Sequence, residues 1–306
     1  MRFLRFDLNL LVALDALLTE RNVTRAAERL NIGQSAASSA LARLRDYFND
    51  ELLVPSGRDL RLSALAQTLV EPVRATLRQA QATLQLQPGF DPATTERRFT
   101  IASSDYVIQV LLVEVVRRLA ELAPGLSVSL MRRPPDALEQ LDRGRIDLLV
   151  VPDFYLASAH PSELLFEDRY VCLVWDGHRS VGETLDAATY LAQPHVASRQ
   201  RETRPYAFED AHWPAEWPER RVEVFVDDFV SVPELVVGTQ RIATVQGRVA
   251  EQALRRGLPL RVLPVPFSIP PLRQAMRWHA TASADPALAW LREQMGLCAQ
   301  STAGSS

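Results

Sequence analysis

Three polar groups in the C-terminal two thirds of the chain have side chains that could act on a small molecule. They are Ser103-Ser104, His195, and Asp228 beside Phe229. A serine, a histidine and an acid are the side chains of a hydrolytic triad, but nothing in their spacing fixes the geometry that a triad needs. The sequence also lacks a nucleophile elbow, a P-loop, a dinucleotide-binding glycine pattern and zinc-ligand spacing. These residue types therefore favour binding, and an α/β hydrolytic enzyme stays as the alternative.

A different chemistry is indicated within residues 34–45, where short polar side chains gather on one side of an expected helix. Ser and Gln can exchange hydrogen bonds with base edges in the DNA major groove, and Arg can contact bases or phosphates. The candidate DNA contacts here are Gln34, Ser35, Ser38, Ser39, Arg43 and Arg45, and Thr24 just before this stretch is a further one. The alternative is an ordinary amphipathic helix with a solvated polar face, because many sequences match the helix-turn-helix pattern without binding DNA.

Two helices joined by a tight turn, over residues 23–42, would position these side chains. Thr24 is the expected N-cap of the first helix, because its hydroxyl can accept a hydrogen bond from the first turn. Ile32, in the turn, can fill the angle between the helices. The second helix has apolar positions at helical spacing: Ala37, Ala40, Leu41, Leu44 and Phe48. A preceding helix, residues 8–21, would pack on this pair through Leu11, Leu14 and Leu18.

Three stretches now carry a family resemblance: Asp7 to Leu11, Val23 to Ala27, and Gln34 to Ser38. They resemble the LysR-type bacterial transcriptional regulators, and most closely the branch with the nodulation-gene activators and the salicylate and nitroaromatic sensors. The resemblance extends over nearly the whole chain and is strongest through Asp59. It implies an N-terminal winged helix-turn-helix domain, then a long linker helix, then two α/β lobes of the periplasmic-binding-protein type.

Composition agrees with a chain of two or three domains. The 306 residues are long for one domain, and the formal net charge of −3 means that any basic DNA-binding surface must be local. The two cysteines, Cys172 and Cys298, lie far apart and fit a reducing compartment. No signal peptide or membrane-length apolar run is visible. We therefore expect a protein of the bacterial cytoplasm, associated with the nucleoid.

Residues 1–63 are the expected DNA-binding domain, and they end in a wing. Two short strands would flank the segment from Pro55 to Arg58, and Arg58 at the tip can reach a phosphate or a narrow minor groove. Residues 64–87 are the expected linker helix, with Ser63 as its cap. Its apolar seam, which the family resemblance assigns to dimerisation, contains Leu69, Val73, Leu77 and Leu84. The alternative is that this seam packs on its own domain.

After a hinge at residues 88–97, strands and helices alternate through residues 98–300, which predicts two α/β lobes. Lobe I is expected at about 98–166 and 269–300, and lobe II at about 167–268. Expected strands lie at 99–103, 126–130, 146–151, 170–174, 222–226, 242–245, 260–263 and 273–278, and expected helices at 107–122, 135–143 and 286–295. Residues 301–306 are expected to be a disordered tail.

The resemblance places a small-molecule effector between the lobes, and ligands of such sheets sit beyond the carboxyl ends of the strands. Candidate contacts are Ser103, Ser104, Phe154, His195, Arg199, Asp228 and Phe229. Asp105, next to the two serines, is favoured as a structural cap over a ligand contact. The effector would be small and aromatic with one or two polar oxygens, and no cofactor is expected.

The expected function is that of a DNA-binding transcriptional regulator switched by this effector, with promoter DNA, a second copy of itself (as dimer or tetramer) and RNA polymerase as partners. A ligand-independent architectural DNA-binding protein is a further alternative. Such a protein would not need an α/β sensor of this length.

Overall fold

The computed structural model describes residues 7, 9–56, 59–85, 90–155, 160–198, 208 and 212–301. The chain divides into two compact units, Met1–Pro88 and Gly89–Ser306. Within the described ranges, none of the helices combines the length and the apolar character of a membrane-spanning segment.

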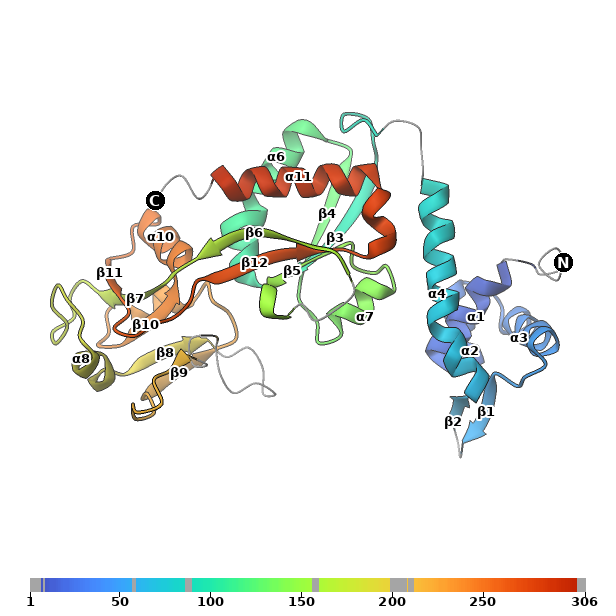
Figure 1. Cartoon of the computed structure of the whole chain (residues 1–306), viewed down its shortest axis with the longest axis horizontal. Helices are drawn as coiled ribbons and strands as arrows, with labels where there is room; N and C mark the ends of the chain where they lie inside the picture. The colour runs from blue at the N-terminus through green and yellow to red at the C-terminus, as the bar shows by residue number, and fades with distance from the viewer. Residues whose placement is uncertain are drawn as a thin grey trace. The chain divides into compact units, whose positions relative to one another are not determined.

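The first unit is a winged helix-turn-helix (Figure 1). It contains α1 (Asn9–Glu20), α2 (Val23–Leu30), α3 (Gln34–Phe48), the hairpin strands β1 (Leu53–Ser56) and β2 (Asp59–Leu62), and α4 (Ala64–Gln85). The apolar positions expected in the helix pair form its core: Ala26, Leu41 and Leu44 are buried together with Leu14 and Leu18 of α1. The predicted three-helix arrangement is confirmed.

Two local expectations in the helix pair were wrong. The N-cap of α2 is Asn22, whose side chain accepts a hydrogen bond from the backbone N–H of Arg25 at 3.0 Å. Thr24 is two residues further on and lies exposed in the first turn, so the cap sits earlier than expected. Ile32 is 42 % exposed and does not fill the interhelical angle. Asn31 ends α2 in the left-handed conformation that Asn tolerates.

The wing is held to α3 by its polar groups. β1 and β2 pair antiparallel from Leu53↔Leu62 to Ser56↔Asp59. The Asp50 carboxylate accepts hydrogen bonds from the backbone N–H of Leu52, at 2.7 Å, and from the Ser63 hydroxyl. Ser63 also caps α4, as expected, since its Oγ accepts from the N–H of Ala66 at 3.0 Å.

Part of the predicted α4 seam packs on its own domain. Val73 is only 4 % exposed within the single unit, and Leu69 and Leu77 pack against the same core. The neighbouring Arg74 is also buried there and bonds to Asp15 of α1 at 3.3 Å. Val73 is therefore part of the domain's own core, whereas Leu69 and Leu77 stay partly exposed, and their role between subunits remains a prediction. The side chain of Leu84, the fourth residue of the seam, lies outside the described ones.

The second unit contains two mixed five-stranded sheets in its described residues, one in each lobe (Figure 1). The lobe I sheet has the order β4-β3-β5-β12-β6, in which β3 is parallel to β4 and β5, and β12 is antiparallel to its neighbours. Its strands are β3 (Arg97–Ser103), β4 (Leu126–Arg132), β5 (Leu148–Pro152), β6 (Ser162–Asp168) and β12 (Leu272–Arg277).

The lobe II sheet has the order β11-β7-β10-β8-β9, with β8 parallel to β9 and β10. Its strands are β7 (Tyr170–Trp175), β8 (His195–Ser198), β9 (Val222–Val226), β10 (Ile242–Gln246) and β11 (Leu260–Pro264). The expected strands are therefore confirmed. Sequence reasoning missed β6 and β8, and also three helices: α8 (Ala187–Ala192), α9 (Val232–Val236) and α10 (Gly247–Arg255).

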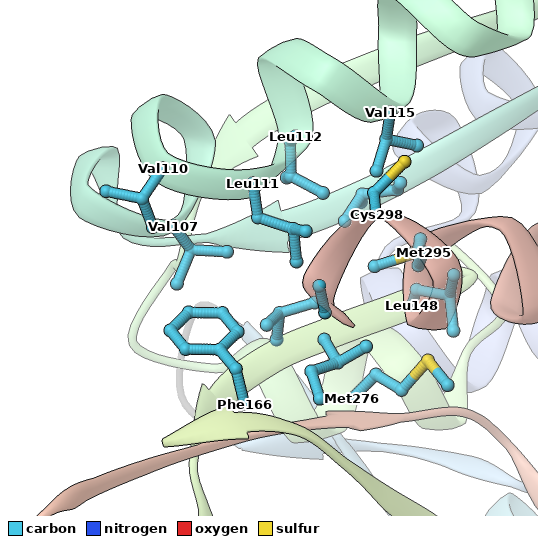
Figure 2. Close-up of a cluster of buried hydrophobic side chains, with 14 of the residues drawn as sticks. Val107, Val110, Leu111, Leu112, Val115, Leu148, Phe166, Met276, Met295 and Cys298 are labelled. Atoms are coloured by element: carbon cyan, nitrogen blue, oxygen red, sulfur yellow. The ribbon is translucent and has the colours of Figure 1, made fainter. Parts of the chain in front are cut away.

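Helices cover both faces of the lobe I sheet. A continuous helical segment runs through α5 (Asp105–Val107), a π-turn, η2 (Ile108–Leu112), and α6 (Val113–Leu122), and it packs beside α11 (Pro286–Ser301). Figure 2 shows Val107, Leu111 and Val115 of this segment directed toward Phe166 and Met276 of the strands, with Met295 and Cys298 of α11 beside them. The opposite face carries α7 (Ala137–Asp142) over a smaller core.

The chain crosses between the lobes twice within the described residues. Arg169 alone separates β6 of lobe I from β7 of lobe II, and the second crossing runs from β11 back to β12. At the first crossing the backbone comes very close to Gly247 at the start of α10. A Cβ at Gly247 would lie 3.1 Å from Asp168 Oδ1 and 3.2 Å from Arg169 Cγ, which explains a glycine at this position.

Candidate DNA-binding face and effector site

The start of α3 presents an uninterrupted polar face. Gln34, Ser35, Ser38 and Ser39 are all exposed, while Ala37 and Leu41 on the other side of the helix are buried. The face is made of short side chains apart from Gln34, and so allows the helix backbone to approach a groove closely. This is the geometry that direct reading of base edges requires.

The two arginines further along α3 differ in their surroundings. Arg43 is exposed, and its guanidinium lies 3.5 Å from Asp7, an exposed pair that leaves the cation accessible. Arg45 is half-buried and donates to the carbonyl oxygens of Glu51, at 2.9 Å, and Leu53, at 3.1 Å. Arg45 therefore fastens the wing to α3, a role that the sequence did not indicate. Arg58 at the wing tip, a predicted DNA contact, lies outside the described residues.

In the second unit, the predicted serines lie where β3 ends and the helical segment begins. Ser103 is fully buried, with its hydroxyl donating to the Ser104 carbonyl at 3.3 Å. The Ser104 hydroxyl caps the helix by accepting from the N–H of Val107 at 3.3 Å. Both hydroxyls therefore have structural partners, and Ser104 is the more accessible of the two.

Asp105 joins the two lobes. Its carboxylate, from lobe I, accepts hydrogen bonds from the backbone N–H groups of Phe229, at 2.7 Å, and Val230, at 3.1 Å, in lobe II. The phenyl ring of Phe229 packs edge-on against Tyr106, with ring centroids 6.1 Å apart. Sequence reasoning favoured a structural role for Asp105, and it found no sign of this long-range partner.

A buried polar chain lies beside this contact. The Tyr106 hydroxyl donates to Asp168 at 2.5 Å, and the Asp168 carboxylate also accepts from the backbone N–H of Arg248 at 3.2 Å. Burial raises the pKa of Asp168, and the hydrogen bond from Tyr106 opposes that rise. Burial, and then the Asp168 charge, raise the pKa of Tyr106 well above its ordinary value, so the phenol stays neutral and keeps donating.

Three aromatic rings form a stack from one lobe to the other. Phe154, which follows β5, stacks on Phe208 with centroids 5.1 Å apart, and Phe208 stacks on Tyr170 at the start of β7, 5.7 Å away. Phe154 also contacts the ring of Tyr155, with centroids 4.6 Å apart, and it remains 48 % exposed, so its exposed part can contact a further ring. Phe154 is therefore part of an aromatic cluster, and its role as a wall of the effector site remains a prediction.

Two buried acceptors lie next to this stack in the sheets. Gln246, at the carboxyl end of β10, pairs with Tyr170, and Gln274 of β12 pairs with Pro152 just before Asp153 and Phe154. The Oε1 atoms of both glutamines are buried without a hydrogen-bond partner in the described part of the chain. Unpaired buried acceptors are costly, so they favour a ligand that brings hydrogen-bond donors. Sequence reasoning missed both glutamines, because each reads as one polar residue in a strand.

The other described residues that were predicted to contact an effector make contacts within the protein itself. The Asp228 carboxylate accepts from the backbone N–H of Ser231 at 2.7 Å and from the Ser231 hydroxyl, so it closes the turn before α9. Phe229 is half-buried against the lobe I core. Arg199 lies outside the described residues. The imagined triad is not assembled, because Ser103 and His195 lie in different sheets and Asp228 bonds to Ser231.

His195 corrects a sequence prediction, because it lies at the wrong end of its sheet to face an effector. It begins β8, which is parallel to β9 and β10, so it lies at the amino ends of these strands. The imidazole is fully buried, edge-on to Tyr190 at 4.7 Å, and its Nε2 is 3.2 Å from the Tyr190 carbonyl oxygen. Burial, aided by the charge of Arg220, lowers the pKa of His195 to about 4, so the ring is neutral near pH 7.

A groove of about 520 Å³ opens elsewhere in this unit, between the segment from η2 to α6 and helix α10. Charged side chains dominate its lining and include Glu114, Arg117, Glu251 and Arg255. Neither the serines nor the aromatic stack contributes to it. This groove is therefore distinct from the predicted effector site.

A winged helix-turn-helix followed by a two-lobed α/β unit is typical of transcriptional regulators that carry a DNA-binding unit and a sensor unit in one polypeptide. Residues 8–67 match the bacterial regulatory helix-turn-helix proteins of the lysR family, and residues 92–296 match the LysR substrate binding domain. The chain belongs to the LysR family of transcriptional regulators, and it is a regulator, not an enzyme.

Relatives over nearly the full length agree with this assignment. The chain is 41 % identical over 293 residues to Nodulation protein D 1 of Mesorhizobium japonicum, covering 96 % of this chain and 93 % of the relative. It is also 41 % identical to Nodulation protein D 2 of Rhizobium tropici, with coverage of 96 % and 93 %.

Solved structures share the fold. The probable transcriptional regulator PA0477 from Pseudomonas aeruginosa matches with a TM-score of 0.64 and 30 % identity over 96 % of this chain and 97 % of that one. A full-length OxyR variant from the same organism matches with a TM-score of 0.71 over 96 % and 95 % of the two chains. At 18 % identity this second match shows the fold alone.

Proposed function

We propose that this regulator binds a specific promoter sequence through α3 and responds to a small hydroxylated aromatic effector held at the carboxyl ends of the strands of both lobes. The observation that carries the effector part is the stack of Phe154, Phe208 and Tyr170, which reaches from one lobe to the other and leaves one ring half exposed.

The chemistry of the site favours an effector with donor groups. A flat ring can extend the stack on Phe154, and phenolic hydroxyls can donate to the unpaired Oε1 atoms of Gln246 and Gln274. Ser104 is a further candidate contact at the helix start. His195 is no longer part of the proposed site, because it lies at the opposite end of the lobe II strands.

The effector test is a reporter assay with a panel of phenolics, flavonoids and aromatic acids, run with wild type and with Phe154→Ala. The mutant should lose the response while its operator binding without effector stays intact. Phe225→Ala is the matched control, since Phe225 is also an exposed phenylalanine, 50 % exposed on β9. A wild type that responds to no compound, or a Phe154→Ala protein that responds fully, would argue against this site.

The DNA part of the proposal rests on the exposed polar face of α3. Gln34→Ala should weaken binding to the specific site by roughly 1–3 kcal/mol and change binding to random DNA little, because base contacts carry sequence information and phosphate contacts do not. Gln67→Ala, an exposed glutamine of α4 in the same unit, is the control. Equal losses on specific and random DNA would show that Gln34 does not read bases.

We also propose that Arg43, Ser35, Ser38, Ser39 and the wing-tip Arg58 add contacts to this interface. Subunits pair into dimers or tetramers, and the partly exposed Leu69 and Leu77 of the α4 seam, with Leu84, are candidate contacts between them. An exposed strip on α4, with Leu65 36 % exposed beside Pro72 and Thr76, is a further candidate surface. The regulator acts in the bacterial cytoplasm at the nucleoid and contacts RNA polymerase there.

In the proposed mechanism the effector changes how the two lobes sit relative to each other. The lobes touch through Asp105 and through the hydrogen bond from the backbone N–H of Arg248 to Asp168, so a ligand that stabilises one arrangement shifts the population toward it. The change reaches DNA as altered spacing of the DNA-binding units in the oligomer. A purely architectural DNA-binding role is disfavoured, because such a role would not require the two-lobed unit.

A further inference from the structure

Two histidines face each other at one end of the lobe I sheet. β6 and β12 pair antiparallel with Arg277 opposite Ser162, and the pairing continues one step beyond, where the N–H of Trp278 donates to the Pro161 carbonyl at 3.4 Å. The next step places His160 opposite His279. Residues opposite each other in an antiparallel pair have neighbouring side chains, and the two imidazole centroids are 4.6 Å apart.

A carboxylate from a third segment completes the group. Asp142 is the last residue of α7, and its Oδ1 lies 2.6 Å from Nε2 of His160. Asp142, His160 and His279 each offer one ligand atom, and these atoms all lie within 4.8 Å of one another. The three residues come from different parts of lobe I, so no motif in the sequence brings them together.

This donor set suits a borderline divalent cation. Zn²⁺ binds imidazole nitrogen and carboxylate oxygen at about 2.0–2.2 Å, which puts the ligands of a tetrahedral site about 3.3 Å apart. The three ligand atoms lie within 4.8 Å of one another, so a bound cation would draw them closer together. All three side chains are half-buried, which allows a cation to enter and still shields it from bulk water.

The surroundings of His279 also fit metal binding. Its Nδ1 accepts a hydrogen bond from the backbone N–H of Thr281 at 3.2 Å and lies 2.8 Å from the Thr281 hydroxyl oxygen. When Nε2 binds a cation, the ring proton moves to Nδ1, which then gives up the bond from the backbone N–H and donates to the Thr281 hydroxyl oxygen. Metal-bound histidines commonly donate their second N–H to an oxygen in this way, which orients the ring.

We propose that Asp142, His160 and His279 form a binding site for a first-row divalent cation such as Zn²⁺. The site is separate from the proposed effector site, because β12 places Arg277 opposite Leu149 near the start of β5 and Gln274 opposite Pro152 at its end. The effector site lies at that carboxyl end and the metal site at the other. A bound cation fastens the end of α7 to the segments before β6 and after β12.

The test uses the untagged full-length protein, stripped of metal with EDTA and titrated with Co²⁺. Co²⁺ replaces Zn²⁺ in such sites and absorbs visible light when four- or five-coordinate. We expect one Co²⁺ per chain with a visible band, displaced by one equivalent of Zn²⁺. Histidine substitutions His160→Gln and His279→Gln, and Asp142→Asn, should each weaken Zn²⁺ binding by about tenfold or more.

His212→Gln is the matched control, because His212 lies in lobe II and does not belong to the group. Circular dichroism of each metal-free variant checks that it is folded. A second readout is thermal unfolding, in which Zn²⁺ should raise the midpoint of the wild type and the control but not of His160→Gln. The proposal is overturned if the wild type shows no Co²⁺ band, or if His160→Gln and His279→Gln bind Zn²⁺ as tightly as the control.

Discussion

Removing the Asp105 carboxylate tests whether it holds the two lobes together. The carboxylate accepts two backbone hydrogen bonds, at 2.7 and 3.1 Å, from Phe229 and Val230. Hydrogen bonds to charged groups contribute about 1.5–3 kcal/mol each, and partial solvent access lowers this. We therefore expect Asp105→Ala to lower the free energy of unfolding of the second unit by about 2–4 kcal/mol. Asp105→Asn keeps one acceptor oxygen, so its free energy of unfolding should lie between those of Asp105→Ala and the wild type.

Tryptophan fluorescence during urea unfolding isolates the unit concerned, because all five tryptophans lie between residues 175 and 290. Glu114→Ala is the control. Glu114 lies on α6 and pairs with Arg117 at 3.4 Å on an exposed surface, where ion pairs contribute little. A free energy for Asp105→Ala within about 0.5 kcal/mol of wild type would refute the reasoning, since typical surface substitutions have effects of that size.

Three further predictions follow from buried groups. Val73→Ala should destabilise the first unit by about 1–3 kcal/mol, measured by far-UV circular dichroism, without changing the oligomeric mass. A change in oligomeric mass with unchanged stability would instead indicate that Val73 lies in a subunit interface. Tyr106→Phe should cost about 1–3 kcal/mol in urea unfolding, because Asp168 loses its buried donor, and no loss would mean that water replaces the hydroxyl. The pKa of His195 in the folded protein is about 4, below the ordinary 6.5, so the unfolded chain takes up the proton first as the pH falls. Stability should therefore drop by roughly 2–3 kcal/mol between pH 7 and 4. Urea titrations should show a smaller drop for His195→Gln, and an equal drop in both proteins would contradict the low pKa.

The sequence predicts the DNA-binding unit well, because its determinants are local. The spacing of Ala37, Leu41 and Leu44 alone defines the buried side of α3, and the polar side follows from it. The N-cap prediction was wrong because two neighbouring residues could each cap the helix. Asn22 and Thr24 are both good caps, and which one is used depends on where the chain leaves α1.

The seam of α4 shows a limit of a different kind. Its spacing specifies an apolar face, but the same face can pack on another subunit or on α1. The choice depends on the tertiary position of α1, which spacing does not encode. Within one chain Val73 is buried against this domain, whereas Leu69 and Leu77 stay partly exposed.

In the second unit, the sequence predicts eight of the ten described strands and misses β6 and β8. Phe154 could be proposed from the sequence because it follows an evident buried strand. His195 was misplaced because sequence does not reveal that it starts a strand instead of following one. Gln246, Gln274 and the partners of Asp105 depend on contacts between segments far apart in the chain.

The interleaved path of the chain has a consequence for how the protein is made. β12 lies between β5 and β6 in the lobe I sheet, yet it is synthesised after the whole of lobe II. Until the ribosome has passed Arg277, β5 and β6 have no strand between them, and their facing edges are open to pairing with other chains. α11, which supplies Met295 and Cys298 to the core, emerges later still. A transcript that ends early, before Leu272, therefore yields a complete DNA-binding unit attached to an unclosed, aggregation-prone lobe.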